Sequence, residues 1–505
     1  MKHTCTTPQA TSLHDGNILF FSSGAFEWKN HLFLKLCSPS DASFLAKVLK
    51  DKKGSFGECF SFILPDSLKY IIAVCTGEKD LPSLRKLEML IRKACAHAKN
   101  LKLPNCMLCL DDLKISGVSS ERLCETVAVN GELAMYHYRT FKEAPKDGWK
   151  DLEQITYLIK DKSKQSSFQK AIDQGSVIGK HVNSTRDLAN CPGGDMTPTW
   201  LSQEAQRRGK ELGISVKILG EKEMEKLGMG AILGVSRGSA QEAKLIVMEY
   251  QKGLKSQKPI VFVGKGITFD TGGINLKPSA GLGEMHMDMS GGASVLHAVC
   301  ALAELGAKVN VVGIIPAAEN MPSGSSYRPG DVLHSMSGKT IEIGNTDAEG
   351  RVVMADAFTY AEKYDPSLVI DIATLTGACM VALGDYAFAV MSPSDDLARK
   401  VQQAGQVCGD YCWPLPLWDE YEQDVKGTVG DVLNAAKNHP RGGAINAACF
   451  LHQFAKKFPL WIHFDIASTM TNYSSSGLAG GASGSGTRLL IEMARNSKEF
   501  LNVKN

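Results

Sequence analysis

The sequence predicts an α/β protein with two domains: a smaller N-terminal α/β domain, and a larger C-terminal domain whose central sheet is mixed, mostly parallel and flanked by helices. Two observations carry this prediction. Short, continuously apolar runs alternate with helix-like segments along the chain, which is typical of sheets that helices cover on both faces. The 505 residues also suffice for two or three domains with large cores.

The N-terminal domain is predicted to span residues 1–165. An apolar run at 70–75, a helix at 82–100 and a second apolar run at 105–110 indicate a βαβ unit. Glycine-rich loops are almost absent from this part of the chain, and no chemical cluster is recognisable in it. We therefore predict a structural or assembly role for this domain.

A connecting helix is predicted at 166–190, and a Cys-Pro-Gly-Gly stop at 191–194 ends it. The C-terminal domain, 191–505, follows. Its predicted strands lie at 244–250, 259–263, 310–315, 340–343, 368–372 and 461–466. Its predicted helices include 292–305, 352–363 and 444–457. A stretch rich in serine and glycine at 474–485 is interpreted as a loop.

Composition excludes several classes of protein. A hydrophobic content of 44% and a charged content of 22% are ordinary for a globular protein, and a net charge of +2 gives no case for binding nucleic acid or an anionic membrane. No signal core and no run of 18 apolar residues is present, so a cytoplasmic protein is predicted. The fourteen cysteines lie mostly in apolar settings, which favours reduced, buried thiols, Cys106 and Cys109 of a CxxC included.

The stretch Asn-Thr-Asp-Ala-Glu-Gly-Arg at 345–351 is the most informative motif. It places Asp347 and Glu349 two residues apart and Arg351 two further on, after a predicted strand. In an extended or tightly turned loop, this spacing directs side chains to one side. Open α/β sheets bind ligands at such strand ends. Taken alone, however, the two carboxylates are also compatible with a solvated turn.

A second motif, at 264–273, follows the predicted strand 259–263 and contains Lys265 and Asp270. Its glycines allow tight backbone geometry and close approach to a ligand. It is not a phosphate-binding loop, because the order Gly-x4-Gly-Lys-Ser/Thr is missing. Lys277 follows the motif. Asp288 stands before the next predicted helix, where it suits helix capping as well as ligand binding.

Together the four acids Asp270, Asp288, Asp347 and Glu349 indicate a two-metal hydrolytic site. Four carboxylates without cations would repel one another and raise their pKa values, whereas two divalent ions would balance them. Oxygen-rich ligation with one nitrogen suits Zn or Mn and also Mg or Co. Lys265 could supply this nitrogen as a neutral amine, or it could be a second cation at the site.

Two further cations have candidate roles at this site. Lys277 is a candidate to stabilise the oxyanion that forms when water attacks a carbonyl. Arg351 stays protonated and cannot act as a base, but its guanidinium could hold an anion such as bicarbonate, carboxylate or phosphate.

These motifs resemble the leucyl (cytosol) aminopeptidase family of two-metal exopeptidases. The 345–351 stretch matches that family's signature in full, and no motif residue is missing. The resemblance covers about 170–490, whereas residues 1–165 fit the family by position and length only. Further matching stretches lie at 185–192, 320–324, 328–331, 373–377, 442–445 and 463–467.

The resemblance implies hydrolysis of the N-terminal peptide bond by a water that bridges two metal ions. Asp270 and Glu349 are similar to the carboxylates that bridge both metals. Lys265 and Asp288 match the remaining ligands of the tighter site, and Asp347 matches the extra ligand of the more exchangeable one. The histidines match no family ligand, so His286, His439 and His463 are left out.

For the chemistry, the resemblance implies that Lys277 polarises the substrate carbonyl and that Arg351 holds a bicarbonate ion as general base. The pocket for an apolar, Leu-like or Met-like N-terminal side chain is matched by Met285, Thr374, Gly377, Ala467 and Met470. Asn345 and Ala348 are candidates for the pocket of the residue after the scissile bond.

The implied partners are peptides with a free N-terminus, and the implied assembly is a homohexamer of two trimers. A DNA-binding, regulatory or scaffold role on the same fold is the alternative. The near-neutral charge and the lack of a basic helix argue against DNA binding.

Overall fold

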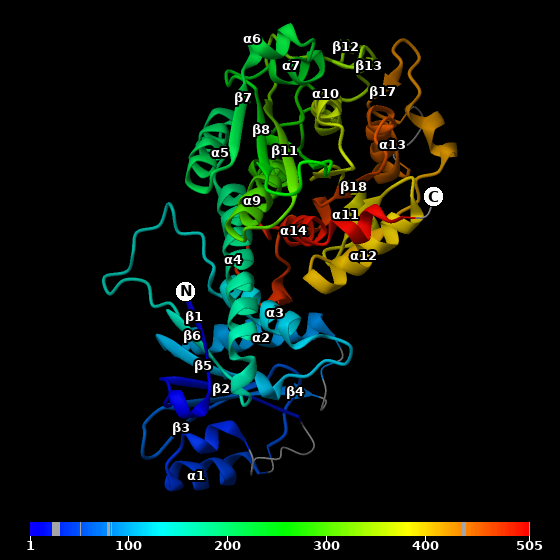
Figure 1. Cartoon of the computed structure of the whole chain (residues 1–505). Coiled ribbons are helices and arrows are strands. Elements are labelled where there is room, and N and C mark those ends of the chain that lie inside the picture. The colour runs from blue at the N-terminus through cyan, green and yellow to red at the C-terminus, as the bar shows by residue number, and fades with distance from the viewer. Residues whose placement is uncertain (23–30, 51, 78–80, 82, 437–440, 504–505) are drawn as a thin grey trace. The chain divides into compact units, whose positions relative to one another are not determined.

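The structure is a computed structural model that describes residues 1–22, 31–50, 52–77, 81, 83–436 and 441–503. It divides into two compact units, which are described separately (Figure 1). Unit 1 comprises Met1–Asn183 with Ser474–Ala479, and unit 2 comprises Ser184–Tyr473 with Gly480–Asn505. The boundary falls inside the long helix α4 (Gln165–Asn190).

Unit 1 is built on a six-stranded sheet of order β1-β6-β5-β2-β4-β3, parallel except for β3. The strands are β1 (Lys2–Thr6), β2 (Gly16–Ser22), β3 (Cys59–Ile63), β4 (Tyr70–Gly77), β5 (Asn105–Cys109) and β6 (Gln154–Leu158). The helices are α1 (Pro39–Leu49), α2 (Leu84–Asn100) and α3 (Ser120–Met135). The predicted βαβ unit is β4, α2 and β5, with β2 inserted between its two strands.

The central sheet of unit 2 has the order β16-β15-β18-β14-β9-β11-β8-β7, and β10 pairs with the far end of β11. Its strands are β7 (Ser215–Leu219), β8 (Lys244–Gln251), β9 (Ile260–Gly264), β10 (Gly266–Asp270), β11 (Asn310–Asn320), β14 (Leu368–Ala373), β15 (Phe388–Met391), β16 (Cys412–Pro414) and β18 (Trp461–Asp465). The middle strands β18, β14, β9 and β11 are parallel. Strand β8 runs antiparallel to β11 and β7, and β15 runs antiparallel to β18 but parallel to the edge strand β16. The predicted mixed, mostly parallel sheet is therefore confirmed.

A small third sheet joins β12 (Val332–His334), β13 (Thr340–Glu342) and β17 (Val432–Leu433). The predicted strand at 340–343 belongs to it and not to the central sheet. This sheet leads directly into the 345–351 motif, so it positions the acidic turn beside the ends of the central strands.

Helices cover both faces of the central sheet, as the apolar strands predict. One face carries α5 (Pro198–Leu212), α9 (Ser290–Glu304) and α14 (Thr487–Arg495). The other carries α7 (Gly230–Ser236), α10 (Glu349–Ala361) and α13 (Gly443–Ala455). The remaining helices are α6 (Glu221–Lys226), α8 (Ser279–Leu282), α11 (Gly377–Leu383), α12 (Asp395–Cys408) and α15 (Ser497–Leu501).

The start of α9 lies unusually close to the central sheet. A Cβ atom on Gly291 would stand 2.2 Å from the carbonyl oxygen of Ile372 in β14. No side chain fits at that separation, so glycine is required for α9 to approach. The close approach places Asp288, just before α9, beside the ends of β9 and β14.

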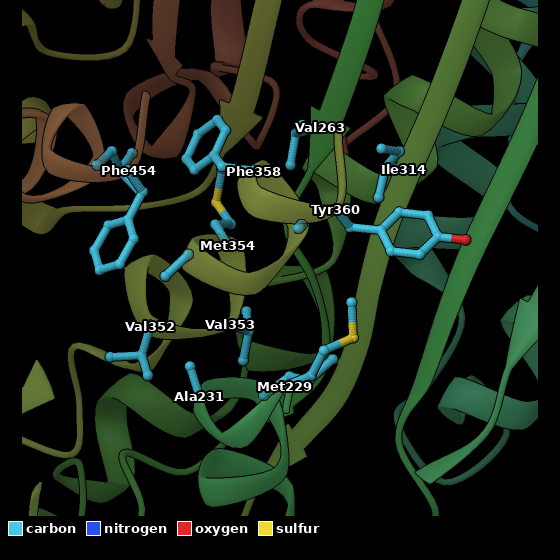
Figure 2. Packing of buried hydrophobic residues seen from close by; sticks show 14 of the residues in the cluster. Met229, Ala231, Val263, Ile314, Val352, Val353, Met354, Phe358, Tyr360 and Phe454 are labelled. Atoms are coloured by element: carbon cyan, nitrogen blue, oxygen red, sulfur yellow. The ribbon is translucent and has the colours of Figure 1, made fainter. Parts of the chain in front are cut away.

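Helix α10 is buried on nearly every side and forms the centre of a large hydrophobic core of unit 2 (Figure 2). Its residue Phe358 is 0% exposed, and its ring packs against Phe458 and Trp461 at centroid distances of 6.3 and 6.5 Å. Val263 of β9 and Ile314 of β11 line the same core, so α10 is clamped to the strands that carry the site.

Replacing Phe358 by alanine should lower the free energy of unfolding by about 3–5 kcal/mol, because a fully buried aromatic ring is lost and a cavity remains. Urea unfolding monitored by circular dichroism measures this. Phe141→Ala, at a ring that is 60% exposed, is the control and should change stability by no more than about 0.5 kcal/mol. Equal effects of the two replacements would contradict the assignment of this core.

All fourteen cysteines lie in the described part of the chain, and none forms a disulfide. Cys106 and Cys109 are buried in β5, as a core position requires. Within the described ranges, none of the helices combines the length and apolarity needed to cross a membrane.

Candidate metal centre

Three buried or half-buried carboxylates converge where the parallel strands of unit 2 end. Asp270 is the last residue of β10, Glu349 is the first residue of α10, and Asp347 lies in the turn before it. One carboxylate oxygen from each lies within 4.8 Å of the others. Asp270 is 2% and Glu349 1% exposed. This is the strand-end position at which open α/β sheets hold their ligands.

Two lysines lie between the carboxylates. Lys265 Nζ is 2.7 Å from Asp288 Oδ2 and 2.8 Å from Glu349 Oε1. Lys277 Nζ is 2.9 Å from Asp270 Oδ2 and 2.5 Å from Asp347 Oδ1. The structure thus brings all five predicted ligands and Lys277 into one cluster.

Asp288 does not cap the helix that follows it. The N-cap position of α9 is Met289, and the Asp288 carboxylate instead pairs with Lys265 and accepts a 2.7 Å hydrogen bond from Thr374 Oγ1. Of the two interpretations that the sequence allowed, the structure therefore agrees with a place in the cluster.

The cluster carries more negative charge than its lysines neutralise. Burial, reinforced by the nearby Asp270, raises the pKa of Glu349 to about 8, and burial raises the pKa of Asp288 to about 6. Burial favours the neutral amine of Lys265, but the facing carboxylates Asp288 and Glu349 outweigh it and raise its pKa. Without metal, Lys265 is therefore an ammonium ion, and a cation would have to displace its proton to use the nitrogen.

Besides the net charge of the cluster, the surroundings of its carboxylate oxygens also fit bound divalent cations. Asp288 Oδ2, Asp347 Oδ1 and Glu349 Oε1 are buried, and the lysine ammonium groups are their close partners among the described residues. No backbone N–H or hydroxyl group in the described part of the chain donates to these three oxygens with regular geometry, so they face the cations of the cluster. Oxygen atoms together with one amine are ligands that Zn and Mn accept.

Helix α10 begins at Glu349, three residues earlier than the sequence predicts. Glu349 and Arg351 therefore lie about 200° apart around a helix rather than on one side of an extended loop. Arg351 is 8% exposed, and its Nη1 donates to the carbonyl oxygen of Asn434 at 2.9 Å. Its buried Nε has no partner among the described residues. Burial lowers the pKa of Arg351 to about 10, so it remains a cation at neutral pH.

The predicted pocket residues lie at the ends of β14, α11 and two 3-10 turns, and one of them contacts the cluster. Thr374 touches it directly, because its carbonyl oxygen accepts a 3.1 Å hydrogen bond from Lys265 Nζ. Gly377 opens α11 and is exposed, with no atom within 4 Å of where a Cβ would stand. Ala467 begins a short 3-10 turn and Met470 follows it; each is 8% exposed, and Met285 is half-buried.

Asp465 at the end of β18 ties these pocket loops together, and the sequence did not single it out. Its Oδ1 accepts from the backbone N–H groups of Leu375, Thr376 and Ala467. Asn434, after β17, holds the acidic turn in the same manner: its Nδ2 donates to the carbonyl oxygens of Asn345 and Ala348. The sequence signal for both residues was a polar side chain at the end of an apolar strand.

The histidines lie outside the cluster. His463 is fully buried, and its Nδ1 is 2.5 Å from Asp371 Oδ1. His286 is half-buried, and burial lowers its pKa. His439 lies outside the described residues.

A further group of possible ligands, which the sequence did not indicate, lies in unit 1: His31, Cys109 and Asp112. His31 Nε2 already pairs with Asp112 at 2.9 Å, and its Nδ1 accepts from the N–H of Phe33. Since these bonds satisfy the imidazole without an ion, we do not interpret the group as a metal centre.

A parallel-centred sheet with buried carboxylates and an amine at its strand ends is an arrangement typical of metal-dependent hydrolytic enzymes. The family model described as cytosol aminopeptidase family, catalytic domain, matches residues 183–491. The chain belongs to this family, and it is accordingly a metallo-exopeptidase that hydrolyses the N-terminal bond of peptides with the help of divalent metal ions.

Relatives support the assignment over most of the chain. A probable cytosol aminopeptidase of Saccharophagus degradans is 44% identical over 472 residues, which is 93% of this chain and 91% of the relative. One of Methylobacillus flagellatus is 43% identical over 418 residues, 83% of this chain and 82% of the relative. Among solved structures, the bottromycin maturation enzyme BotP in complex with Mn is similar with a TM-score of 0.83 and 28% identity, covering 96% of this chain and 99% of that one.

Proposed function

We propose that the chain releases apolar N-terminal residues, Leu and Met above others, from peptides at the cluster described above. The proposed metal ligands are Lys265, Asp270, Asp288, Asp347 and Glu349, which would hold two divalent ions, Zn or Mn. The observation that supports this most is the buried convergence of four carboxylates whose charge the two lysines do not balance. When bound, such ions supply Lewis acidity that activates water and polarises a carbonyl.

Lys277 is the proposed electrophile for the substrate carbonyl. Its side chain is 18% exposed, against 4% for Lys265, so it lies on the open side of the cluster. Burial favours its neutral form, but Asp270 and Glu349 outweigh this and raise its pKa. A protonated amine on the open side can donate a hydrogen bond to an oxyanion, and it cannot serve as the base.

Arg351 is proposed to hold a bicarbonate ion that acts as general base. Its buried Nε without a partner among the described residues supports an anion site, because a guanidinium edge binds planar oxyanions through paired N–H donors. Its bond to the Asn434 carbonyl oxygen fixes the other side of the guanidinium and would keep this edge in place.

The pocket for the N-terminal side chain is proposed to comprise Met285, Thr374, Gly377, Ala467 and Met470. Methionine is flexible and polarizable, so such a pocket accepts apolar side chains of differing shape. Asn345 and Ala348 are proposed for the following residue of the peptide. Asn345 is half-buried in the acidic turn, next to the proposed ligand Asp347.

Metal removal tests the proposal. We expect hydrolysis of Leu- and Met-p-nitroanilide to vanish after chelation and to return with Mn²⁺ or Zn²⁺, and Glu-p-nitroanilide to be a poor substrate throughout. Metal analysis before and after chelation, with a mock-dialysed sample as control, gives the stoichiometry. Full activity in protein shown to be metal-free would exclude this function.

We further propose a cytoplasmic homohexamer, on the basis of the family resemblance. Light scattering should then report the mass of six 54.6 kDa chains. A single chain at micromolar concentration would contradict the assembly without affecting the proposed chemistry.

A further inference from the structure

We propose that Asn320, the last residue of β11, is a positioning residue that orients the Asp270 carboxylate and fastens the acidic turn to it. The inference rests on the proposed function, because it concerns the geometry of the same metal centre. Asn320 is 0% exposed. It lies in the part of β11 beyond the predicted strand, opposite Asp270 in the pairing of β10 with β11.

The side chain of Asn320 joins the two segments that carry proposed ligands. Its Nδ2 donates to Asp270 Oδ1 at 2.8 Å and to the carbonyl oxygen of Thr346 at 2.9 Å. Both partners are acceptors, so the amide nitrogen must face them and the orientation of the amide is unambiguous. One NH₂ group thus links β10 to the acidic turn.

The two oxygens of Asp270 are thereby given different roles. Oδ1 accepts from Asn320 Nδ2 and from the N–H of Gly272 at 2.9 Å. Oδ2 faces the Lys277 ammonium group at 2.9 Å, on the cation side of the cluster. The terminal torsion of an aspartate is broad, so an unanchored carboxylate would rotate. Two donors on Oδ1 hold Oδ2 towards the cation side.

The acidic turn is fixed by the same contact. The Thr346 carbonyl oxygen that receives Asn320 also accepts from Tyr327 Oη at 2.8 Å. Thr346 Oγ1 also donates to the carbonyl oxygen of Gly272 at 2.7 Å. Gly272 lies two residues after Asp270, so this bond is a second link between the acidic turn and the segment that carries Asp270. Asp347 and Glu349 follow directly, so the separation between Asp270 and these acids depends on this link.

The same strand offers a matched control at its other end. Asn310, the first residue of β11, is 5% exposed, and its Nδ2 donates to the carbonyl oxygens of Leu254 and Gln257 at 2.9 and 2.8 Å. It therefore has the same side chain, a similar burial and the same number of Nδ2 bonds as Asn320, but no contact with a proposed ligand. A purely structural role for Asn320 predicts that Asn310→Ala and Asn320→Ala behave alike.

The experiment compares Asn320→Ala, Asn320→Leu and Asn310→Ala with the wild-type protein. Leucine keeps the branching at Cγ and removes the amide, so it separates the hydrogen bonds from the volume. We expect both Asn320 variants to bind Mn²⁺ about 10–100-fold more weakly, as loss of a partner behind a metal ligand does. Calorimetric titration of chelator-stripped protein measures this directly.

Kinetics provide the second readout. For the Asn320 variants, kcat for Leu-p-nitroanilide should fall, KM should stay within about two-fold, and excess metal should restore part of kcat. Asn310→Ala should lose comparable thermal stability and keep wild-type metal affinity. The inference is overturned if both Asn320 variants bind metal and turn over like the wild type, or if Asn310→Ala weakens metal binding equally. Wild-type protein that binds no metal would instead refute the proposed function itself.

Discussion

Replacing Glu349 by glutamine is expected to reduce hydrolysis of Leu-p-nitroanilide by about 10³-fold or more, which corresponds to several kcal/mol of lost transition-state stabilisation. Glutamine keeps the shape of the side chain and removes the charge that faces Lys265 and the other acids. Metal analysis should show fewer than two ions per chain. Asp270→Asn should act in the same way, since its oxygens belong to the same cluster.

Glu319 provides the matched control. It is buried in β11 of the same unit, 8% exposed, and accepts a hydrogen bond from Ser239 instead of facing the cluster. Glu319→Gln should therefore keep its metal and most of its activity. If Glu349→Gln kept wild-type activity and metal content, the cluster would take no part in the mechanism.

Glu349→Gln should leave the metal-free protein at least as stable as the metal-free wild-type protein. Glu349 is buried among Asp270 and Asp288, so the metal-free protein carries repulsion that glutamine would relieve. Functional sites commonly store strain at the expense of stability. Thermal unfolding of both proteins after chelation measures this, and a lower midpoint for the variant would contradict it.

The central strands could be predicted closely, because buried parallel strands are continuous apolar runs. The ends of these strands near the site could not be predicted. Strand β11 continues for five residues beyond the predicted end at 315, through Pro316, which an interior strand position disfavours. Residues 266–270 suggested a glycine-rich loop, yet they form β10 because β11 extends far enough to pair with them.

The residues proposed as ligands could be singled out from the sequence, whereas the residues that hold them in place could not. Acids at short spacing and a lysine among glycines form a pattern that a single chain can display. The residues that hold them are single polar residues at strand ends, namely Asn320, Asn434 and Asp465. Their partners are distant in the sequence: Asp270 lies 50 residues from Asn320, Ala348 lies 86 residues from Asn434, and Thr376 lies 89 residues from Asp465. Only the folded chain identifies such pairs.

Gly350 is one such position inside the 345–351 motif. The sequence offers no reason for a glycine in the first turn of a helix, where it costs about 0.5–1 kcal/mol relative to alanine. The structure does: a Cβ there would stand 2.4 Å from Cε, 2.7 Å from Nζ and 2.8 Å from Cδ of Lys265. Lys265 is 3% exposed and is held by Asp288, Glu349 and the Thr374 carbonyl oxygen, so it cannot move aside without losing these contacts.

Gly350→Ala should therefore lower hydrolysis of Leu-p-nitroanilide by about 10²-fold, the cost of an ångström-scale displacement at a catalytic centre. Helix content should stay unchanged, because alanine favours the helix. Metal analysis should show the loss of about one of the two proposed ions, since the Lys265 side of the cluster is displaced while Asp270 and Asp347 remain. Gly324→Ala is the control, because a Cβ at Gly324 meets no atom within 4 Å. Unaltered activity and two bound ions in Gly350→Ala would contradict the displacement of Lys265 and with it this prediction.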